Sequence, residues 1–182
     1  MKYFGLFIKK LLRYLLKPLS FLPALCMMYL IYSFSAQPGA LSGSLSQKVT
    51  TGVVSLADRV LSLDLDATRQ ALYIQTLHFY IRKAAHITEY FLLAVSVALP
   101  LYVYRLRGFK LVLAAGIFCV GFAMLDEYHQ SFVVGRSASA RDVAIDSIGI
   151  FIGIYTTRIA GWLGRKTLFR PLSMSTRSRK TS

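Results

Sequence analysis

Four apolar runs divide this chain, and each is about as long as a membrane-spanning helix. They cover residues 19–36, 84–104, 111–127 and 142–163. About 20 predominantly apolar residues are needed to cross the hydrocarbon core of a bilayer. Only 16% of the residues are charged, whereas a soluble domain carries about a quarter. The sequence therefore predicts an all-α integral membrane bundle of four transmembrane helices, because a soluble domain of this size could not bury four such runs.

Residues 37–80 connect the first two runs and carry a different pattern. Apolar residues recur every three or four positions, and polar residues fill the other side. The apolar set is Leu41, Leu45, Val49, Val53, Leu56, Val60 and Leu63. This spacing predicts an amphipathic helix, which we expect to lie flat on the outer side of the bundle. Residues 64–68 predict a turn, and Thr68 is a candidate cap for a short helix that ends near Tyr80.

The two ends of the chain are basic. Residues 1–17 place their Lys and Arg residues on one helical face, which fits either a helix on an anionic membrane surface or a charged flank of the first span. A cleaved signal peptide is a third interpretation, because Ser33 and Ser35 resemble a cleavage site. Residues 18–163 then form the membrane domain. Residues 164–182 are predicted to be a disordered basic tail that is attracted to anionic lipid.

The distribution of charge predicts the orientation. The net charge is +14, but the Lys and Arg residues sit between apolar runs, so we expect no nucleic-acid partner. Most of them flank the termini or lie in the 105–110 turn, whereas all eight acidic residues fall on the other side of the predicted membrane. Lys and Arg are enriched in cytoplasmic loops. Both termini are therefore predicted to be cytoplasmic, and the long first connection is predicted to be outside.

Polar and ionisable residues gather where three of the predicted spans reach the outer side. Such residues at membrane depth are functional candidates. The candidates for catalysis are His86, Glu89 and Asp126. The candidates for substrate binding are Lys83, Glu127, Gln130, Arg136, Asp142 and Asp146. Their spacing of three or four within each helix places them on shared faces, so the sequence predicts a polar pocket at the outer membrane surface.

A structural network is the alternative interpretation of this cluster. Arg136 or Arg141 would then neutralise a carboxylate at a helix end, and His86 would hydrogen-bond Asp126. A divalent metal is compatible with His, Glu and Asp ligands, but no diagnostic motif such as HExxH is present. Acid–base chemistry without a metal is equally open, and the cofactor stays unknown.

Three blocks of the sequence resemble the VanZ-like family of small multi-pass membrane proteins. Residues 33–37 (SFSAQ) are similar to the FS-x-Q block of that family, and residues 83–90 (KAAHITEY) to its K-x-x-H-x-x-x-Y block. Residues 126–149 are similar to its D-E-x-x-Q-x-F-x-x-G-R…D…N-x-x-G block. Asp146 departs from the usual Asn, and Val134 from a common Pro. A role carried over for the amide would therefore not transfer to Asp146.

The resemblance implies a multi-pass protein of the bacterial plasma membrane, in a family whose founding member is associated with resistance to the glycopeptide teicoplanin. One hypothesis is an envelope protein whose outer pocket recognises a lipid headgroup, a lipid-linked cell-wall precursor or a glycopeptide. A second is a hydrolase or transferase that acts on an envelope lipid, with Glu89 or Asp126 as the base. A small transporter is the third, although the acids gather at one side and no broken helix is visible near the midplane.

Overall fold

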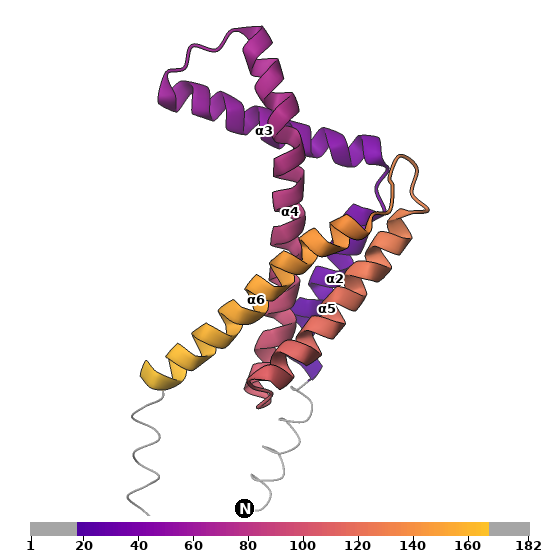
Figure 1. Cartoon of the computed structure of the whole chain (residues 1–182), viewed down its shortest axis with the longest axis vertical. Helices are drawn as coiled ribbons and strands as arrows, with labels where there is room; N and C mark the ends of the chain where they lie inside the picture. Colours follow the sequence, from indigo (N-terminus) through magenta and orange to yellow (C-terminus); the bar gives the residue numbers. More distant parts are fainter. Residues whose placement is uncertain (1–17, 168–182) are drawn as a thin grey trace, which may run out of the picture.

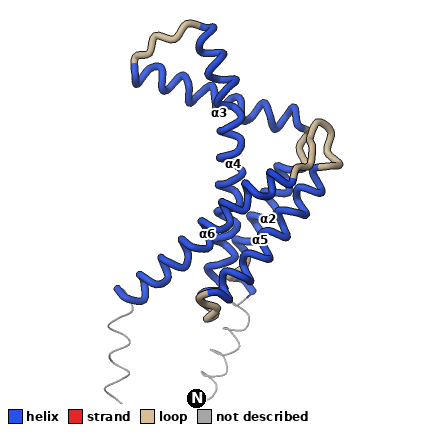
Figure 2. Tube along the Cα trace, viewed as in Figure 1, coloured by secondary structure: helices blue, strands red, loops and turns tan. Residues whose placement is uncertain are grey.

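A computed structural model describes residues 18–167, with side chains to Gly164, and these residues fold into five α-helices and no strand (Figures 1 and 2). The helices are α2 Leu22–Ser35, α3 Gly39–Leu61, α4 Ala67–Val103, α5 Phe109–Gln130 and α6 Ala140–Thr167. The prediction of an all-α chain is confirmed. The basic segment 1–17 lies outside the described residues, as does 168–182, and the first four residues of the predicted tail continue α6.

Three of these helices are long and apolar enough to cross a membrane, namely α4, α5 and α6. The first predicted span is represented by α2, which has 14 residues. At 1.5 Å per residue it is about 21 Å long, whereas the hydrocarbon core of a bilayer is about 30 Å thick. The membrane-spanning prediction is thus supported for three helices. The fourth span and the cytoplasmic placement of the termini stay predictions.

Helix α4 is a single helix of 37 residues, so the predicted break between a short helix ending near Tyr80 and a span beginning at residue 84 is wrong. No Gly or Pro interrupts residues 67–99, and nothing there stops helix propagation. The helix also begins earlier than expected. Asp66 is its N-cap, because its Oδ1 atom accepts a hydrogen bond of 2.8 Å from the backbone N–H of Arg69.

Helix α3 confirms the predicted amphipathic helix, and it runs across α4 rather than along it (Figure 1). Its polar side faces α4, where Ser46 Oγ lies 2.7 Å from Nε2 of His78. Its first residue, Gly39, donates a backbone hydrogen bond of 3.0 Å to the carbonyl of Val134 in the α5–α6 loop. The apolar residues of the opposite side, including Leu56 and Val60, are largely exposed. This side is therefore free to contact lipid.

The core of the bundle is a stripe of small and aliphatic residues. On α5 the stripe recurs at every fourth position and consists of Leu111, Ala115, Cys119 and Ala123. It packs with α4 residues such as Leu93 and Val97 and with Ile150 of α6. Towards the end of α5 the same buried face continues as Asp126 and Gln130. The helical period that builds the apolar core therefore also carries polar groups into it.

Two glycines bring α6 against α4. A Cβ atom on Gly149 would collide with the carbonyl oxygen of Ile87, and one on Gly153 would lie 2.6 Å from the carbonyl oxygen of Phe91. Both neighbours are backbone atoms, which cannot rotate away. This GxxxG pair is therefore a device for close helix packing, and it fixes the register between the two helices that carry most of the charged pairs.

We expect Gly149→Ala to destabilise the bundle by about 1–3 kcal/mol, because its methyl group would overpack the α4–α6 contact. The measurement is the thermal unfolding midpoint of the purified chain in detergent micelles. The matched control is Gly121→Ala in α5, where a Cβ would meet no atom within 4 Å. The control should leave the midpoint unchanged or raise it, since Ala is the better helix former. Equal effects of the two changes would contradict the close-packing account.

Candidate functional site

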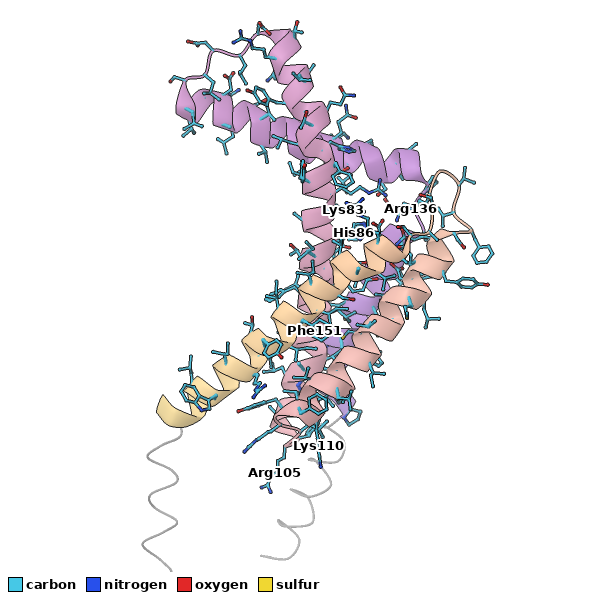
Figure 3. The ribbon with its side chains drawn as sticks, in the orientation of Figure 1. Lys83, His86, Arg105, Lys110, Arg136 and Phe151 are labelled. Atoms are coloured by element: carbon cyan, nitrogen blue, oxygen red, sulfur yellow. The ribbon has the colours of Figure 1, made fainter. Side chains whose placement is uncertain are left out.

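The predicted site residues lie at the end of the bundle that faces α3 and the α5–α6 loop. Figure 3 places Lys83, His86 and Arg136 together in this region. The residues separate into a buried cluster around Asp126, a set of contacts between α4, α5 and α6, and a pocket under α3. The contacts of each group are described in turn.

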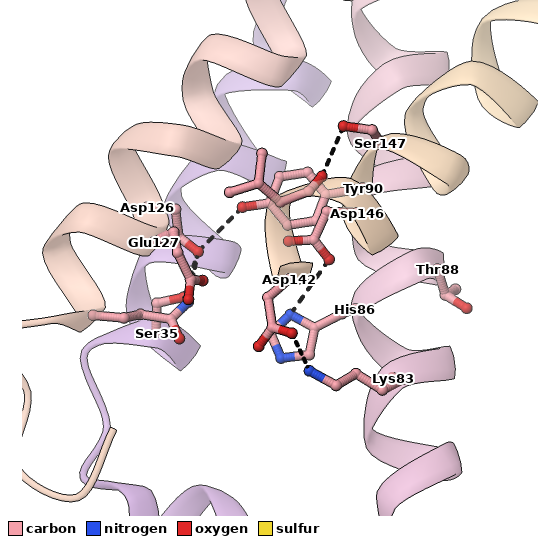
Figure 4. Close-up of polar contacts among 12 residues, drawn as sticks. Ser35, Lys83, His86, Thr88, Tyr90, Asp126, Glu127, Asp142, Asp146 and Ser147 are labelled. Carbon is pink, nitrogen blue, oxygen red and sulfur yellow. Dashed lines mark hydrogen bonds and ion pairs between the residues drawn. The ribbon is translucent and has the colours of Figure 1, made fainter. Parts of the chain in front are cut away.

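Asp126 is 5% exposed and is the centre of the buried cluster (Figure 4). Its Oδ2 atom accepts hydrogen bonds from Ser35 Oγ at 2.8 Å and from Gln130 Nε2 at 2.9 Å. A third hydrogen bond comes from the Tyr90 hydroxyl at 3.1 Å. Three donors from three helices thus converge on one carboxylate oxygen. All three hydrogen bonds go to Oδ2, whereas Oδ1 is buried without a hydrogen-bond partner among the described residues. Asp126 does not line the pocket under α3.

Ser35 and Tyr90 were not among the predicted site residues. A signal for both was present, because each lies in a block that resembles the family pattern: Ser35 in residues 33–37 and Tyr90 at the end of residues 83–90. Helical spacing does not link either residue to Asp126, since the three residues belong to different helices. Only the tertiary arrangement brings them together.

Arg136 fastens the α5–α6 loop to the end of α2. Its Nη1 atom donates to Oε1 of Gln130 at 2.8 Å. Its Nε and Nη2 atoms donate to the backbone carbonyls of Gln37 and Phe34, at 3.1 and 2.9 Å. These carbonyls lie at the end of a helix, where no intrahelical donor is available. Burial, followed by the positive charge of nearby Arg82, lowers the pKa of the Arg136 guanidinium from its ordinary value.

Two contacts between polar side chains join α4 to α6 (Figure 4). Lys83 Nζ lies 2.6 Å from Asp142 Oδ1. His86 Nδ1 lies 3.9 Å from Oδ1 of Asp146, which is 4% exposed. This second distance is too long for a hydrogen bond. Lys83 and Asp142 are therefore paired with each other between the two helices, and Asp146 is buried near His86. None of these three predicted binding residues lines the pocket under α3.

Glu127 helps to cap the N-terminus of α6. Its Oε1 atom accepts a hydrogen bond of 2.6 Å from the backbone N–H of Ser139. Ser139 Oγ in turn accepts a hydrogen bond of 3.2 Å from the backbone N–H of Arg141. In a capping box the acid three residues after the cap would supply the first of these bonds. Here Glu127 supplies it from another helix, which leaves Asp142 free to pair with Lys83.

A pocket of about 180 Å³ lies between α3, α4 and the end of α2. Its charged and titratable lining is Arg82, His86, Glu89 and Arg136, and its apolar lining includes Phe34, Leu45, Val49 and Ile81. Three predicted site residues, His86, Glu89 and Arg136, line this pocket. The other six do not.

Arg82 and Glu89 are the unengaged charges of this pocket. Within residues 18–164, neither side chain forms a hydrogen bond or an ion pair, although both are partly buried. Arg82 was missed as a site residue because it precedes the predicted second span and resembled a basic flank. Its place on the continuous helix α4, one turn before His86, puts it in the pocket.

No cluster suitable for a metal ion is found among the described residues, since no three His, Cys, Asp or Glu side chains come together in the required arrangement. His86 and Glu89 both line the pocket under α3, but the carboxylate nearest to His86 is Asp146, at 3.9 Å. The residues present therefore supply no ligand set from which a metal-dependent step can be derived.

We expect Arg136→Lys to destabilise the protein by about 2 kcal/mol or more, because one ammonium group cannot reach three acceptors as the guanidinium does. The readout is the thermal midpoint in detergent. Arg141→Lys is the matched control, since the Arg141 side chain is exposed and makes no ion pair within the described residues. If Arg136→Lys and Arg141→Lys unfold at the same temperature, the fastening role assigned to Arg136 is wrong.

Comparison with known proteins identifies the family of this chain. The VanZ/LLP1 family model matches residues 20–161, a range that contains the buried cluster, the α4–α6 contacts and the pocket. No curated protein and no solved structure matches the chain. Because the match covers most of the chain and α4, α5 and α6 are long and apolar enough to cross a membrane, this chain belongs to the VanZ/LLP1 family and is a membrane protein.

Proposed function

We propose that this protein binds an amphiphilic envelope molecule with an anionic headgroup in the pocket under α3. The observation that carries the proposal is the guanidinium of Arg82, which lines the pocket and has no partner in residues 18–164. A partly buried cation without a counter-ion is unfavourable. Arg82 is therefore placed to accept an anion from outside the chain, with Arg136 beside it.

The charge on Arg136 supports an anionic ligand. Although Arg136 donates three hydrogen bonds to the protein, a guanidinium has five N–H donors. Burial and the charge of Arg82 both disfavour its protonated form. An anion between the two guanidinium groups would relieve this repulsion. A phosphate suits this position, because guanidinium groups bind phosphate oxygens with matching geometry.

The apolar part of the pocket favours an amphiphile over a free anion. Leu45 and Val49 of α3 line it together with Ile81 of α4. The same side of α3 continues as an exposed apolar face. A hydrocarbon tail could therefore leave the pocket along α3 and enter the bilayer. We place this pocket at the outer face of the bacterial plasma membrane, where a lipid headgroup, a lipid-linked cell-wall precursor or a lipid-tailed glycopeptide such as teicoplanin would be met.

Arg82→Gln should raise the dissociation constant for a polyprenyl phosphate by about 10-fold or more, because a charge-assisted hydrogen bond is lost. Binding would be followed as ligand-dependent thermal stabilisation in detergent, with the uncharged polyprenol as the reference ligand. Arg59→Gln is the control, since it removes the same charge from an exposed position on α3. Equal affinity of wild type and Arg82→Gln, or equal binding of the phosphate and the alcohol, would refute the anion site.

A second candidate function is hydrolysis or group transfer on the bound amphiphile. The observation that favours it is Glu89, a carboxylate that lines the same pocket without a hydrogen-bond partner among the described residues. A carboxylate so placed could act as a general base towards water or a hydroxyl group. His86 lines the same pocket one turn earlier on α4. Asp126, the other predicted base, is held by three donors outside the pocket.

Glu89→Gln separates binding from catalysis. If the protein is an enzyme, we expect this variant to bind polyprenyl phosphate as the wild type does and to lose teicoplanin resistance in a sensitive Gram-positive host at matched membrane levels. If the protein only binds, resistance should be lost in Arg82→Gln and kept in Glu89→Gln. If the wild type confers no resistance, this chain does not act on teicoplanin. The binding measurement with polyprenyl phosphate would then decide whether the anion site exists.

A further inference from the structure

The end of the bundle opposite the proposed ligand pocket is strongly basic. Figure 3 shows Arg105 and Lys110 at the turn between α4 and α5, far from Lys83 and Arg136. All eight acidic residues of the chain fall within residues 58–66, at position 89 or within residues 126–146. None of them belongs to this end, so its cations are not neutralised by the chain's own carboxylates.

This end contains a second pocket, of about 440 Å³, lined by Tyr102, Arg107, Gly108, Arg158, Ile159 and Trp162. It is built on a specific contact between α4 and α6. A Cβ atom on Gly161 would collide with the ring of Tyr102, so the missing side chain lets that ring lie against the α6 backbone. Tyr102 is accordingly 9% exposed. The guanidinium of Arg107 then lies 5.6 Å from the centre of this ring, a favourable cation–π distance.

Arg107 and Arg158 bring two positive charges to this pocket from different parts of the chain. Neither forms an ion pair with a carboxylate in the part of the chain that the structure describes. Both are exposed, so each is available to a ligand. Trp162, which is 47% exposed, borders the same pocket. Trp is enriched at the level of lipid headgroups, and basic pockets between membrane helices bind anionic lipid headgroups.

We propose that this pocket binds the phosphate group of an anionic phospholipid, with Arg107 and Arg158 on the phosphate and Trp162 beside the glycerol and upper acyl region. The surroundings favour a lipid over a soluble anion. Val103 and Phe109, which flank the turn, are 68% and 75% exposed, as expected of side chains in contact with lipid. The site is separate from the pocket under α3 and does not depend on the function proposed for it.

The test compares two variants with the same change in charge at the same end of the bundle. Arg107→Gln/Arg158→Gln removes both cations of the pocket, whereas Arg105→Gln/Lys110→Gln removes two that do not line it. The full chain in detergent is titrated with phosphatidylglycerol or phosphatidylcholine. Retained lipid is counted by native mass spectrometry, and the thermal midpoint is recorded. We expect the wild type to prefer phosphatidylglycerol, and we expect the pocket variant alone to weaken that binding by about tenfold.

Several results would overturn the site. Equal weakening in the two double variants would show diffuse surface attraction, and no preference of the wild type for phosphatidylglycerol would remove the basis of the proposal. Equal stabilisation by soluble glycerol phosphate would assign the pocket to a free anion. Arg158→Gln alone leaves the Arg107–Tyr102 contact intact, so it should weaken phosphatidylglycerol binding even if the double variant folds poorly. Unchanged binding in this single variant would also refute the proposal.

Discussion

The polar interior of this bundle is organised by hydrogen bonds to one buried carboxylate oxygen, Oδ2 of Asp126. A carboxylate deep among membrane helices is unfavourable unless several donors converge on it, and those of Asp126 come from Ser35 of α2, Tyr90 of α4 and Gln130 of α5. Gln130 also accepts a hydrogen bond from Arg136, whose guanidinium donates to the carbonyl of Phe34 in α2 and to that of Gln37 just beyond it. These hydrogen bonds connect the end of α2, the last turns of α5 and the following loop to one another.

Charged side chains that have a partner inside the protein differ in their expected role from those that have none. Some charged groups make contacts between elements of the bundle: Lys83 pairs with Asp142, and Glu127 accepts a hydrogen bond from the backbone of Ser139. Removing any of these side chains would leave its partner without a hydrogen bond. Arg82 and Glu89 have no such partner within the described residues and lie on a pocket. The structural and functional interpretations of the polar cluster are therefore both useful, because they apply to different residues. This division, rather than the number of charged residues, identifies where a ligand is expected.

Much of the fold could be predicted from hydropathy and helical period. The apolar runs indicated the bundle, and the spacing from Leu41 to Leu63 indicated α3. The continuity of α4 was missed because a cluster of charges at Arg82 and Lys83 resembles a boundary between a surface helix and a span. Those charges are accommodated because α3 and α6 pack beside them. Because Arg82 was assigned to this boundary, it was not recognised as a residue of the pocket.

The partners of individual site residues could not be predicted, because spacing along a helix fixes faces and not rotations between helices. The structural-network interpretation paired His86 with Asp126, yet the carboxylate that lies nearest to His86 is that of Asp146. Asp142 has the spacing of a capping acid, yet Glu127 takes that role from another helix. In both cases the placement of the helices relative to one another decides which of several carboxylates a group meets. For α4 and α6, the close contact of Gly149 with Ile87 is part of that placement. No local pattern contains that information.

The unbroken helix α4 has a mechanical consequence. Its 37 residues form a rod about 55 Å long that carries α3 near one end and packs with α5 and α6 near the other. No break in the helix separates these regions, so a displacement of one end cannot be taken up by bending at a hinge. The backbone contacts at Gly149 and Gly153 hold the middle of α4 against α6. A force that moves α3 away from the bundle must therefore tilt the whole rod. A displacement at the α3 end would thus change the inclination of α4 at its other end.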